Sequence, residues 1–146
     1  MAAFLALLLA APAAPPIEPA AAIALADAHA PRGARGVFAM TVASAQRTDK
    51  AVFLNSTPDY RRPDNLTFAL SIAAANALRR RWGAAPETVL IGKRVVVKGD
   101  VTNHPIANLL YGRPRSFNRV QHEVEVRQAG NVLSAVDALA PVSPTG

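Results

Sequence analysis

The chain contains no cysteine among its 146 residues. This absence excludes disulfide bonds, a CxxC redox centre and thiolate-ligated metal sites. Aromatic residues make up only 5% of the sequence, so a hydrophobic core must be built mainly from valine, leucine and isoleucine. Charged side chains of either sign are absent before Glu18. The sequence therefore divides into an uncharged N-terminal stretch and a charged body of a size suited to one domain.

The body is basic. The formal net charge is +6 at pH 7, and all sixteen lysine and arginine residues lie from Arg32 onward. A basic surface attracts polyanions such as nucleic acid or anionic lipid headgroups. Thirteen of these cations are arginine, and alanine, proline and glycine are also abundant, as in chains from GC-rich genomes. Composition bias therefore explains the charge as well as a selected polyanion site does.

The first residues read as an export signal. Residues 1–11 form the apolar run MAAFLALLLAA, and small residues suited to cleavage follow it. The run is too short for a confident membrane span, and the positively charged start of a typical signal is missing. We expect a signal peptide over residues 1–13, with a soluble apolar tail or an uncleaved anchor as alternatives. The predicted location is the periplasm or cell envelope, with no stable transmembrane span after cleavage.

Proline is concentrated between the expected signal peptide and the body. Four prolines lie between residue 14 and residue 36. Each fixes φ and lacks an N–H donor, which disfavours a continuous helix. We therefore predict a Pro/Ala-rich linker over residues 14–36, within which residues 20–29 form at most a transient helix.

Alternating hydrophobicity predicts strands in the body, residues 37–136. The period becomes helical at Ala73, where Ala74, Leu78 and Trp82 are spaced by four, and Gly83 is a suitable helix stop. A short helical turn is expected over residues 86–91, an irregular loop over 103–118 and a flexible tail over 137–146. The predicted strands cover residues 37–46, 51–55, 66–72, 94–101 and 119–127, with a further short strand over 132–136.

Five strands with one helix between the third and the fourth form the element order of the OB-fold, a small Greek-key barrel that is often partly open. We therefore predict a mainly β domain: an OB-fold-like five-stranded Greek-key barrel with one helical crossover between strands 3 and 4.

Two segments carry a resemblance to a known family. The first joins Phe53-Leu54-Asn55-Ser56 and Tyr60 to Leu66-Thr67, and the second is Gly92-Lys93-x-Val95-x-Val97-x-Gly99. Over residues 37–136 these motifs resemble a family of exported bacterial OB-fold domains. The resemblance implies that fold and, by analogy of fold alone, nucleic-acid binding. The chain departs from the family over residues 103–118, where members often carry an aromatic strand extension.

The candidate ligand-binding residues are cations and polar groups of the predicted strands and loops. Guanidinium and ammonium groups bind phosphate, while amides and phenols add hydrogen bonds or stacking. A structural role competes at two positions, because Asn55 can satisfy local backbone groups and Tyr60 can pack over the barrel end. The candidate set is Arg47, Lys50, Asn55, Tyr60, Arg61, Arg94, Lys98, Arg113 and Arg115.

Motifs for catalysis and metal binding are missing from the sequence. HxxxH, HxH, HExxH, GxSxG, P-loop and GxGxxG patterns do not occur. We therefore predict no catalytic residue, metal or cofactor, and we expect His122 to be a hydrogen-bonded core residue. Arg79, Arg80 and Arg81 point about 100° apart on a helix, so a solvated helix end is their simplest interpretation.

The sequence thus predicts a non-catalytic OB-fold binding module that binds single-stranded nucleic acid or another polyanion through a basic barrel face. An alternative is a protein-interaction or structural module of the cell envelope, indicated by the export signal and by the apolar residues 106–111. A nuclease-like hydrolase is the weakest alternative, because no acid–base or metal constellation can be assembled.

Overall fold

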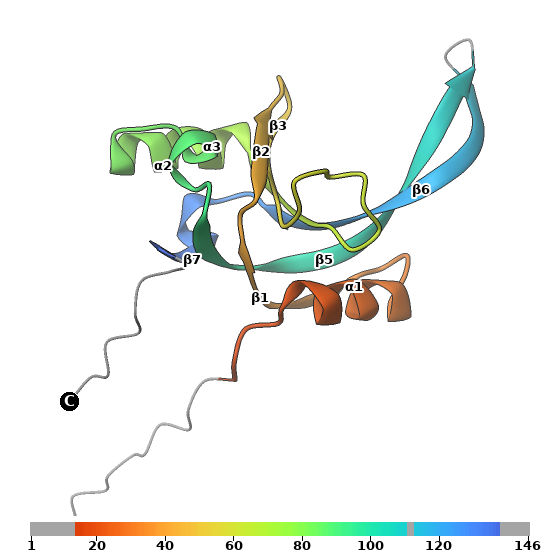
Figure 1. The fold of residues 1–146 in the computed structure, drawn as a ribbon, viewed down its shortest axis with the longest axis horizontal. Coiled ribbons are helices and arrows are strands. Elements are labelled where there is room, and N and C mark those ends of the chain that lie inside the picture. The colour runs from red at the N-terminus through yellow and green to blue at the C-terminus, as the bar shows by residue number, and fades with distance from the viewer. Residues whose placement is uncertain (1–13, 111–112, 138–146) are drawn as a thin grey trace, which may run out of the picture.

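The protein is described by a computed structural model over residues 14–110 and 113–137, with side chains described for residues 14–106 and 119–137. Within these residues, seven strands form one mixed sheet, and three α-helices pack against it (Figure 1). The elements in chain order are α1 (Pro19–Ala28), β1 (Ala34–Thr41), β2 (Ser44–Arg47), β3 (Ala51–Asn55), β4 (Leu66–Ser71), α2 (Ile72–Trp82), α3 (Pro86–Val89), β5 (Lys93–Leu110), β6 (Arg113–Val126), a 3-10 turn (Ala129–Asn131) and β7 (Val132–Asp137).

The strand order is β1-β5-β6-β4-β3-β2, and β7 pairs with the start of β5. All pairs are antiparallel except β4 with β6, which are parallel. The pairing does not close the sheet into a barrel. The mainly β prediction is confirmed, with seven strands in a mixed sheet rather than the expected five.

The two ends of this strand order, β1 and β2, are consecutive in the chain and are separated only by Val42 and Ala43. The Val42 N–H donates to the Lys93 carbonyl at 3.0 Å, whereas the Ala43 N–H donates to the Asn55 carbonyl at 2.8 Å. The single strand predicted over residues 37–46 is therefore two strands, because the backbone changes its partner at these residues.

The crossover helix agrees closely with the sequence pattern. α2 begins directly after β4, and the Ser71 hydroxyl caps it by accepting a hydrogen bond from the Ala74 N–H at 3.1 Å. Gly83 follows the helix with a left-handed φ of 74° and ends it, a conformation that glycine adopts without steric cost. The predicted helix start, stop and second helical turn are confirmed, with α3 ending two residues early.

The prediction of an irregular loop over residues 103–118 is wrong. β5 and β6 continue into this segment as an antiparallel hairpin that extends away from the body as an arm (Figure 1). Its prolines and glycine favoured an irregular loop. Register shifts at Ile106/Ala107 and Asn108/Leu109 accommodate this irregular sequence without ending the ladder, as β-bulges do.

The segment expected as a linker, residues 14–36, carries helix α1 and packs on the sheet. Pro19 stands in the first turn of α1, where its missing N–H is not needed. Ala22 and Ala26 are fully buried, so the helix lies close to the strands. Ile17 forms a parallel bridge with Phe38 of β1. Prolines at the helix boundaries rather than in its interior therefore permit an ordered helix.

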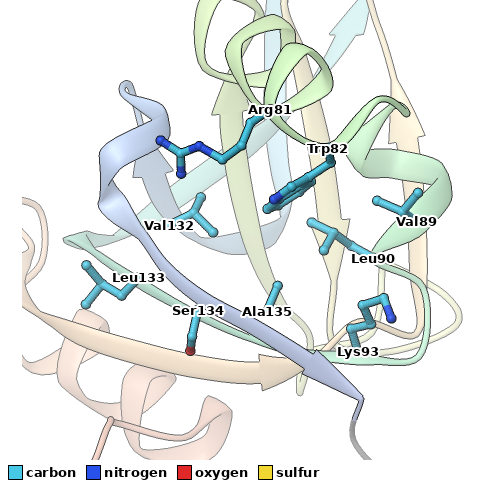
Figure 2. A pocket seen from close by; sticks show the side chains of 9 residues that line it. All are labelled: Arg81, Trp82, Val89, Leu90, Lys93, Val132, Leu133, Ser134 and Ala135. Carbon is cyan, nitrogen blue, oxygen red and sulfur yellow. The ribbon is translucent and has the colours of Figure 1, made fainter.

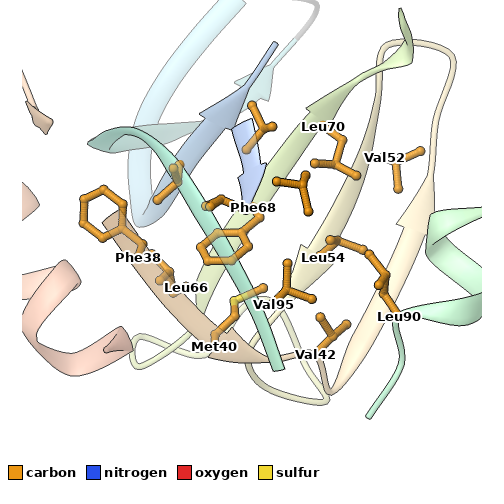
Figure 3. Close-up of a cluster of buried hydrophobic side chains, with 14 of the residues drawn as sticks. Phe38, Met40, Val42, Val52, Leu54, Leu66, Phe68, Leu70, Leu90 and Val95 are labelled. Carbon is orange, nitrogen blue, oxygen red and sulfur yellow. The ribbon is translucent and has the colours of Figure 1, made fainter. Parts of the chain in front are cut away.

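The hydrophobic core lies between the strands and the helices and draws its large side chains from nearly every element (Figure 3). α1 covers the end of the core at Phe38, and α3 covers the end at Leu90 (Figures 1 and 3). Within the described residues, no helix has the length and apolar character needed to cross a membrane.

Gly99 marks the point where β5 changes its neighbour along one edge. β7 pairs with β5 up to Val97, and β6 pairs with it from Asp100 onward. A Cβ atom at Gly99 would lie only 2.8 Å from the Glu125 carbonyl oxygen. The absent side chain therefore allows the close approach of β5 and β6.

The burial of α1 predicts a position-specific response to enlarging its alanines. Ala26→Leu should lower the free energy of unfolding by about 1 to 3 kcal/mol, because a larger side chain does not fit at the packed helix–sheet contact. Ala24→Leu, the same change at an exposed position of the same helix, should change it by less than about 0.5 kcal/mol. Urea denaturation measures both. Equal effects would mean that α1 does not pack as described.

Candidate binding site

Three of the predicted ligand cations are engaged with carboxylates. Arg47 lies 3.2 Å from Glu87, and Arg61 lies 3.0 Å from Asp59. The hydrogen bond from the Arg61 side chain holds the pKa of Asp59 below its ordinary value. Arg94 pairs with Glu18 just before α1. Each partner offsets the charge of its cation, so these arginines contribute little net attraction for a polyanion.

The other predicted cations do not form one surface. Lys50 is exposed in the turn between β2 and β3, and Lys98 is exposed on β5, opposite Val37 of β1. Arg113 and Arg115 lie on β6, with side chains outside the described residues. The structure therefore does not gather the predicted set around one ligand.

Asn55 belongs to a buried polar network that folds the loop over residues 56–65. The Thr67 hydroxyl donates to Asn55 Oδ1 at 2.8 Å and accepts from Asn65 Nδ2 at 2.9 Å. Asn55 Nδ2 donates to the Ser44 hydroxyl at 3.3 Å, and the Thr57 N–H donates to Asn65 Oδ1 at 3.1 Å. Asn55, Asn65 and Thr67 are all buried. The residues that carry much of the family resemblance thus hold a loop in place.

Tyr60 is also engaged within the protein. The guanidinium of Arg119 lies over its ring, 5.0 Å from the ring centroid, within the range of a cation–π interaction. This contact joins the loop after β3 to β6 and covers a ring face that a base would need for stacking.

The outer face beside Asn55 carries acid groups. Glu123 and Glu125 of β6 are opposite Thr67 and Ala69 of β4. Burial raises the pKa of Glu123 above its ordinary value, and the nearby charge of His104 opposes this shift. Glu125 pairs with Arg127 at 3.0 Å, so this face carries mixed charge rather than the row of unpaired cations that attracts a phosphate backbone.

His122 connects the hairpin to α1. It is buried, and its Nε2 lies 2.7 Å from Asp27 Oδ1, which also accepts a hydrogen bond from Asn103 Nδ2 at 2.7 Å. The hydrogen bond with His122 lowers the pKa of Asp27 below its ordinary value, against the effect of burial. The expected hydrogen-bonded core histidine is confirmed, and its partner comes from the segment that was predicted to be a linker.

A cleft that the sequence did not reveal lies between α2, α3 and β7 (Figure 2). It arises because β4 and β6 stop pairing at Leu70 and Val126, after which the chain of β4 turns into α2. β7 continues along β5, and no other strand of the described residues pairs with it. The cleft encloses about 410 Å³ and is lined by Arg81, Trp82, Val89, Leu90, Lys93, Val132, Leu133, Ser134 and Ala135.

The helical period places Arg81 and Trp82 over this cleft. The buried stripe of α2 includes Leu78, and residues three and four positions later lie on the same side of a helix. Trp82 is 36% exposed, and Figure 2 shows its indole ring pointing into the cleft. The spacing of four was visible in the sequence, but the pattern alone does not show that the stripe extends beyond the core.

Cations surround the cleft. Arg79, Arg80 and Arg81 are exposed at the end of α2, and none of them forms an ion pair with a carboxylate within the described residues. Lys93 lies across the cleft from Arg81 (Figure 2) and pairs with Asp137 at 2.6 Å. The three arginines diverge as predicted, and Arg81 is the one that lines the cleft.

Comparison with known proteins found no family model that matches the chain and no similar curated protein. Within residues 14–110 and 113–137, no group of three or more histidine, aspartate or glutamate side chains is arranged to hold a metal ion. The site must therefore be interpreted from its own geometry.

The buried polar network predicts that loss of the Thr67 hydroxyl destabilises the protein. Thr67→Val keeps the side-chain shape but removes the hydrogen-bond partner of Asn55 Oδ1 and of Asn65 Nδ2, and it should lower the free energy of unfolding by about 1 to 3 kcal/mol. Thr88→Val makes the same chemical change at an exposed position of α3 and should alter it by less than about 0.5 kcal/mol. Urea unfolding of both variants checks this. A Thr67→Val protein as stable as wild type would contradict the network.

The Asp27–His122 contact predicts a change in acid stability. Because its folded-state pKa is lowered, Asp27 adds stability above about pH 4, and this contribution is lost as the pH falls through the lowered value. Asp27→Asn should reduce stability at pH 6 and weaken the decline below about pH 4. Asp49→Asn, in the exposed turn after β2, should retain the wild-type profile. Unfolding midpoints measured from pH 6 to well below about pH 4 test the difference.

Proposed function

We propose that the protein is a non-catalytic binding module with an OB-like architecture, and that it binds polyanions at the end of α2. The observation that carries this proposal is the group of three exposed arginines, Arg79, Arg80 and Arg81, beside a cleft with an exposed tryptophan. Within the described residues these arginines have no carboxylate partner, in contrast to Arg47, Arg61 and Arg94.

The pairing pattern supports the OB-like interpretation. If β1 and β2 are taken as one bent first strand, then the first strand pairs with the second and the fourth, the second with the third, and the fourth with the fifth. The third and fifth, β4 and β6, are parallel. In this interpretation β7 is an added strand. OB-like folds bind oligomers on their open surfaces, but fold analogy alone does not locate the site here.

The charge distribution favours the end of α2 over the barrel face first predicted. On that face, Asn55 and Tyr60 are engaged in internal contacts, and Glu123 and Glu125 lie nearby. At the end of α2, three cations lie on consecutive residues without local neutralisation. A polyanion can therefore neutralise charge there and release its counterions.

The proposal includes two predictions from the sequence: the protein is exported, and it belongs to the family of exported bacterial OB-fold domains that it resembles. Residues 1–13, on which the signal peptide rests, lie outside the described residues. Because the cell envelope holds little nucleic acid, export would favour the alternative of a protein-interaction or structural module.

A second candidate function, protein interaction, is favoured by one specific observation. Ile91, Leu133 and Val136 are 46%, 52% and 55% exposed, and they lie in or close to the elements that form the cleft. Exposed apolar side chains that gather on one surface are typical of protein contacts.

A salt titration with two charge-matched variants tests the proposed function. The triple variant Arg79→Gln/Arg80→Gln/Arg81→Gln should bind labelled oligothymidylate and heparin at least about tenfold more weakly at low salt. Its slope of log affinity against log salt should be shallower for the oligonucleotide by about 0.7 for each of these arginines that contacts a phosphate. Fluorescence anisotropy measures both quantities.

The control variant is Arg61→Gln/Arg62→Gln/Arg127→Gln. It removes the same total charge from arginines that are each paired with a carboxylate, and it should retain most of the affinity. Equal losses in the two variants would show that net charge alone attracts the polyanion. Wild-type binding that is absent or independent of salt would refute the function.

A further inference from the structure

We infer that the cleft between α2 and β7 binds one unpaired base of a single-stranded nucleic acid, stacked on Trp82, with the flanking phosphates held by Arg81 and Lys93. This inference rests on the proposed function and names the class of polyanion that the site selects.

Trp82 has the properties of a stacking platform. It is the last residue of α2, it lines the cleft, and 36% of the residue is exposed. In Figure 2 the indole points into the cleft, with Val132 and Ala135 of β7 opposite. A ring that already points into the cleft can receive a base without a change in the direction of its side chain.

The size and the lining of the cleft suit a planar heteroaromatic group. Its volume of about 410 Å³ falls in the range of roughly 300 to 1,000 Å³ that is typical of small-molecule sites. Val89, Leu90 and Val132 supply apolar surface around the ring. The lining joins this ring and these aliphatic side chains to the polar groups of Arg81, Lys93 and Ser134, so a base can stack on the ring while polar groups stand within the same cleft.

The two lining cations lie where a nucleic-acid backbone could reach them. Arg81 and Lys93 are on opposite sides of the cleft in Figure 2. A nucleotide whose base enters the cleft has a phosphate on each side of its sugar, so Arg81 can meet one phosphate and Lys93 can meet the other once it releases Asp137. Arg79 and Arg80 extend the positive surface beyond the cleft.

This arrangement selects single strands over duplexes and over other polyanions. The bases of a duplex are stacked inside the helix, whereas an unpaired base can turn onto an aromatic side chain. Base–aromatic stacking strengthens binding by about 5- to 150-fold per base. Polyanions without bases have only the electrostatic contribution.

The test compares a labelled oligothymidylate of about ten nucleotides with an abasic oligonucleotide of the same length, using the full chain. Wild type should prefer the base-containing strand by at least about fivefold. Trp82→Ala should lose this preference while retaining abasic binding, and Trp82→Phe should retain part of it. Val120→Ala, which shortens an exposed apolar side chain of β6 that does not line the cleft, should keep the preference.

Intrinsic fluorescence gives a second readout, because Trp82 is the single tryptophan of the chain. The oligothymidylate should quench its emission, and the abasic strand and heparin should quench it much less. Far-UV circular dichroism of each variant confirms that it is folded. If Trp82→Ala does not fold, quenching in the wild-type protein still decides the question.

The outcomes separate this inference from the function on which it rests. Salt-dependent binding without a preference for bases and without quenching would overturn the stacking site and leave the polyanion module standing. Absence of salt-dependent binding to every polyanion would overturn both. Quenching by an acidic peptide but not by oligothymidylate would overturn the inference in favour of protein docking.

Discussion

β5 pairs with three other strands, and the arrangement of the rest of the molecule depends on it. β1 runs along one edge, while β7 and then β6 occupy the other edge in succession. The change of neighbour occurs at Gly99, where a side chain would collide with the Glu125 carbonyl. Because β7 and β6 share one edge, the end of the β4–β6 pairing opens a gap beside β7, and α2 and α3 line this gap. The cleft is therefore a consequence of how one strand distributes its hydrogen bonds.

Local ion pairing separates the cations of this protein into two groups. Most of the arginines first assigned to a ligand have a carboxylate beside them, and their exposed pairs contribute little to stability or to long-range attraction. The arginines at the end of α2 have no such partner within the described residues. A net charge of +6 thus says less about binding than the positions at which charge is left uncompensated.

The periodicity of apolar residues and the residues that end helices were enough to predict several elements from the sequence. Alternation located β3 and β4, and the spacing of Ala74 and Leu78 with Gly83 located α2 and its end. The hairpin after Asn103 was missed, because the turn-forming residues there lie in bulged strands rather than in a loop. α1 was missed because alanine gives no amphipathic signal, although its small size is what lets Ala22 and Ala26 pack on the sheet.

The site was harder to predict than the fold. Asn55 and Tyr60 carried motif-like signals, but their partners, Thr67 and Arg119, are 12 and 59 positions away in the sequence, and local patterns do not reveal such pairings. Trp82 fitted the helical stripe of a core residue. Whether such a residue is buried depends on what the fold places over it, and here β7 leaves a cleft.

Lys93 has two possible partners in the cleft region, and they exclude each other. Its ammonium group is held 2.6 Å from the carboxylate of Asp137 at the end of β7. An anion that takes this position must displace Asp137, so occupancy of the cleft and attachment of the last residue of β7 oppose each other. By thermodynamic reciprocity, the factor by which the Asp137 contact lowers the affinity for the ligand equals the factor by which the ligand weakens that contact. The last residue of β7 therefore competes with the ligand for Lys93.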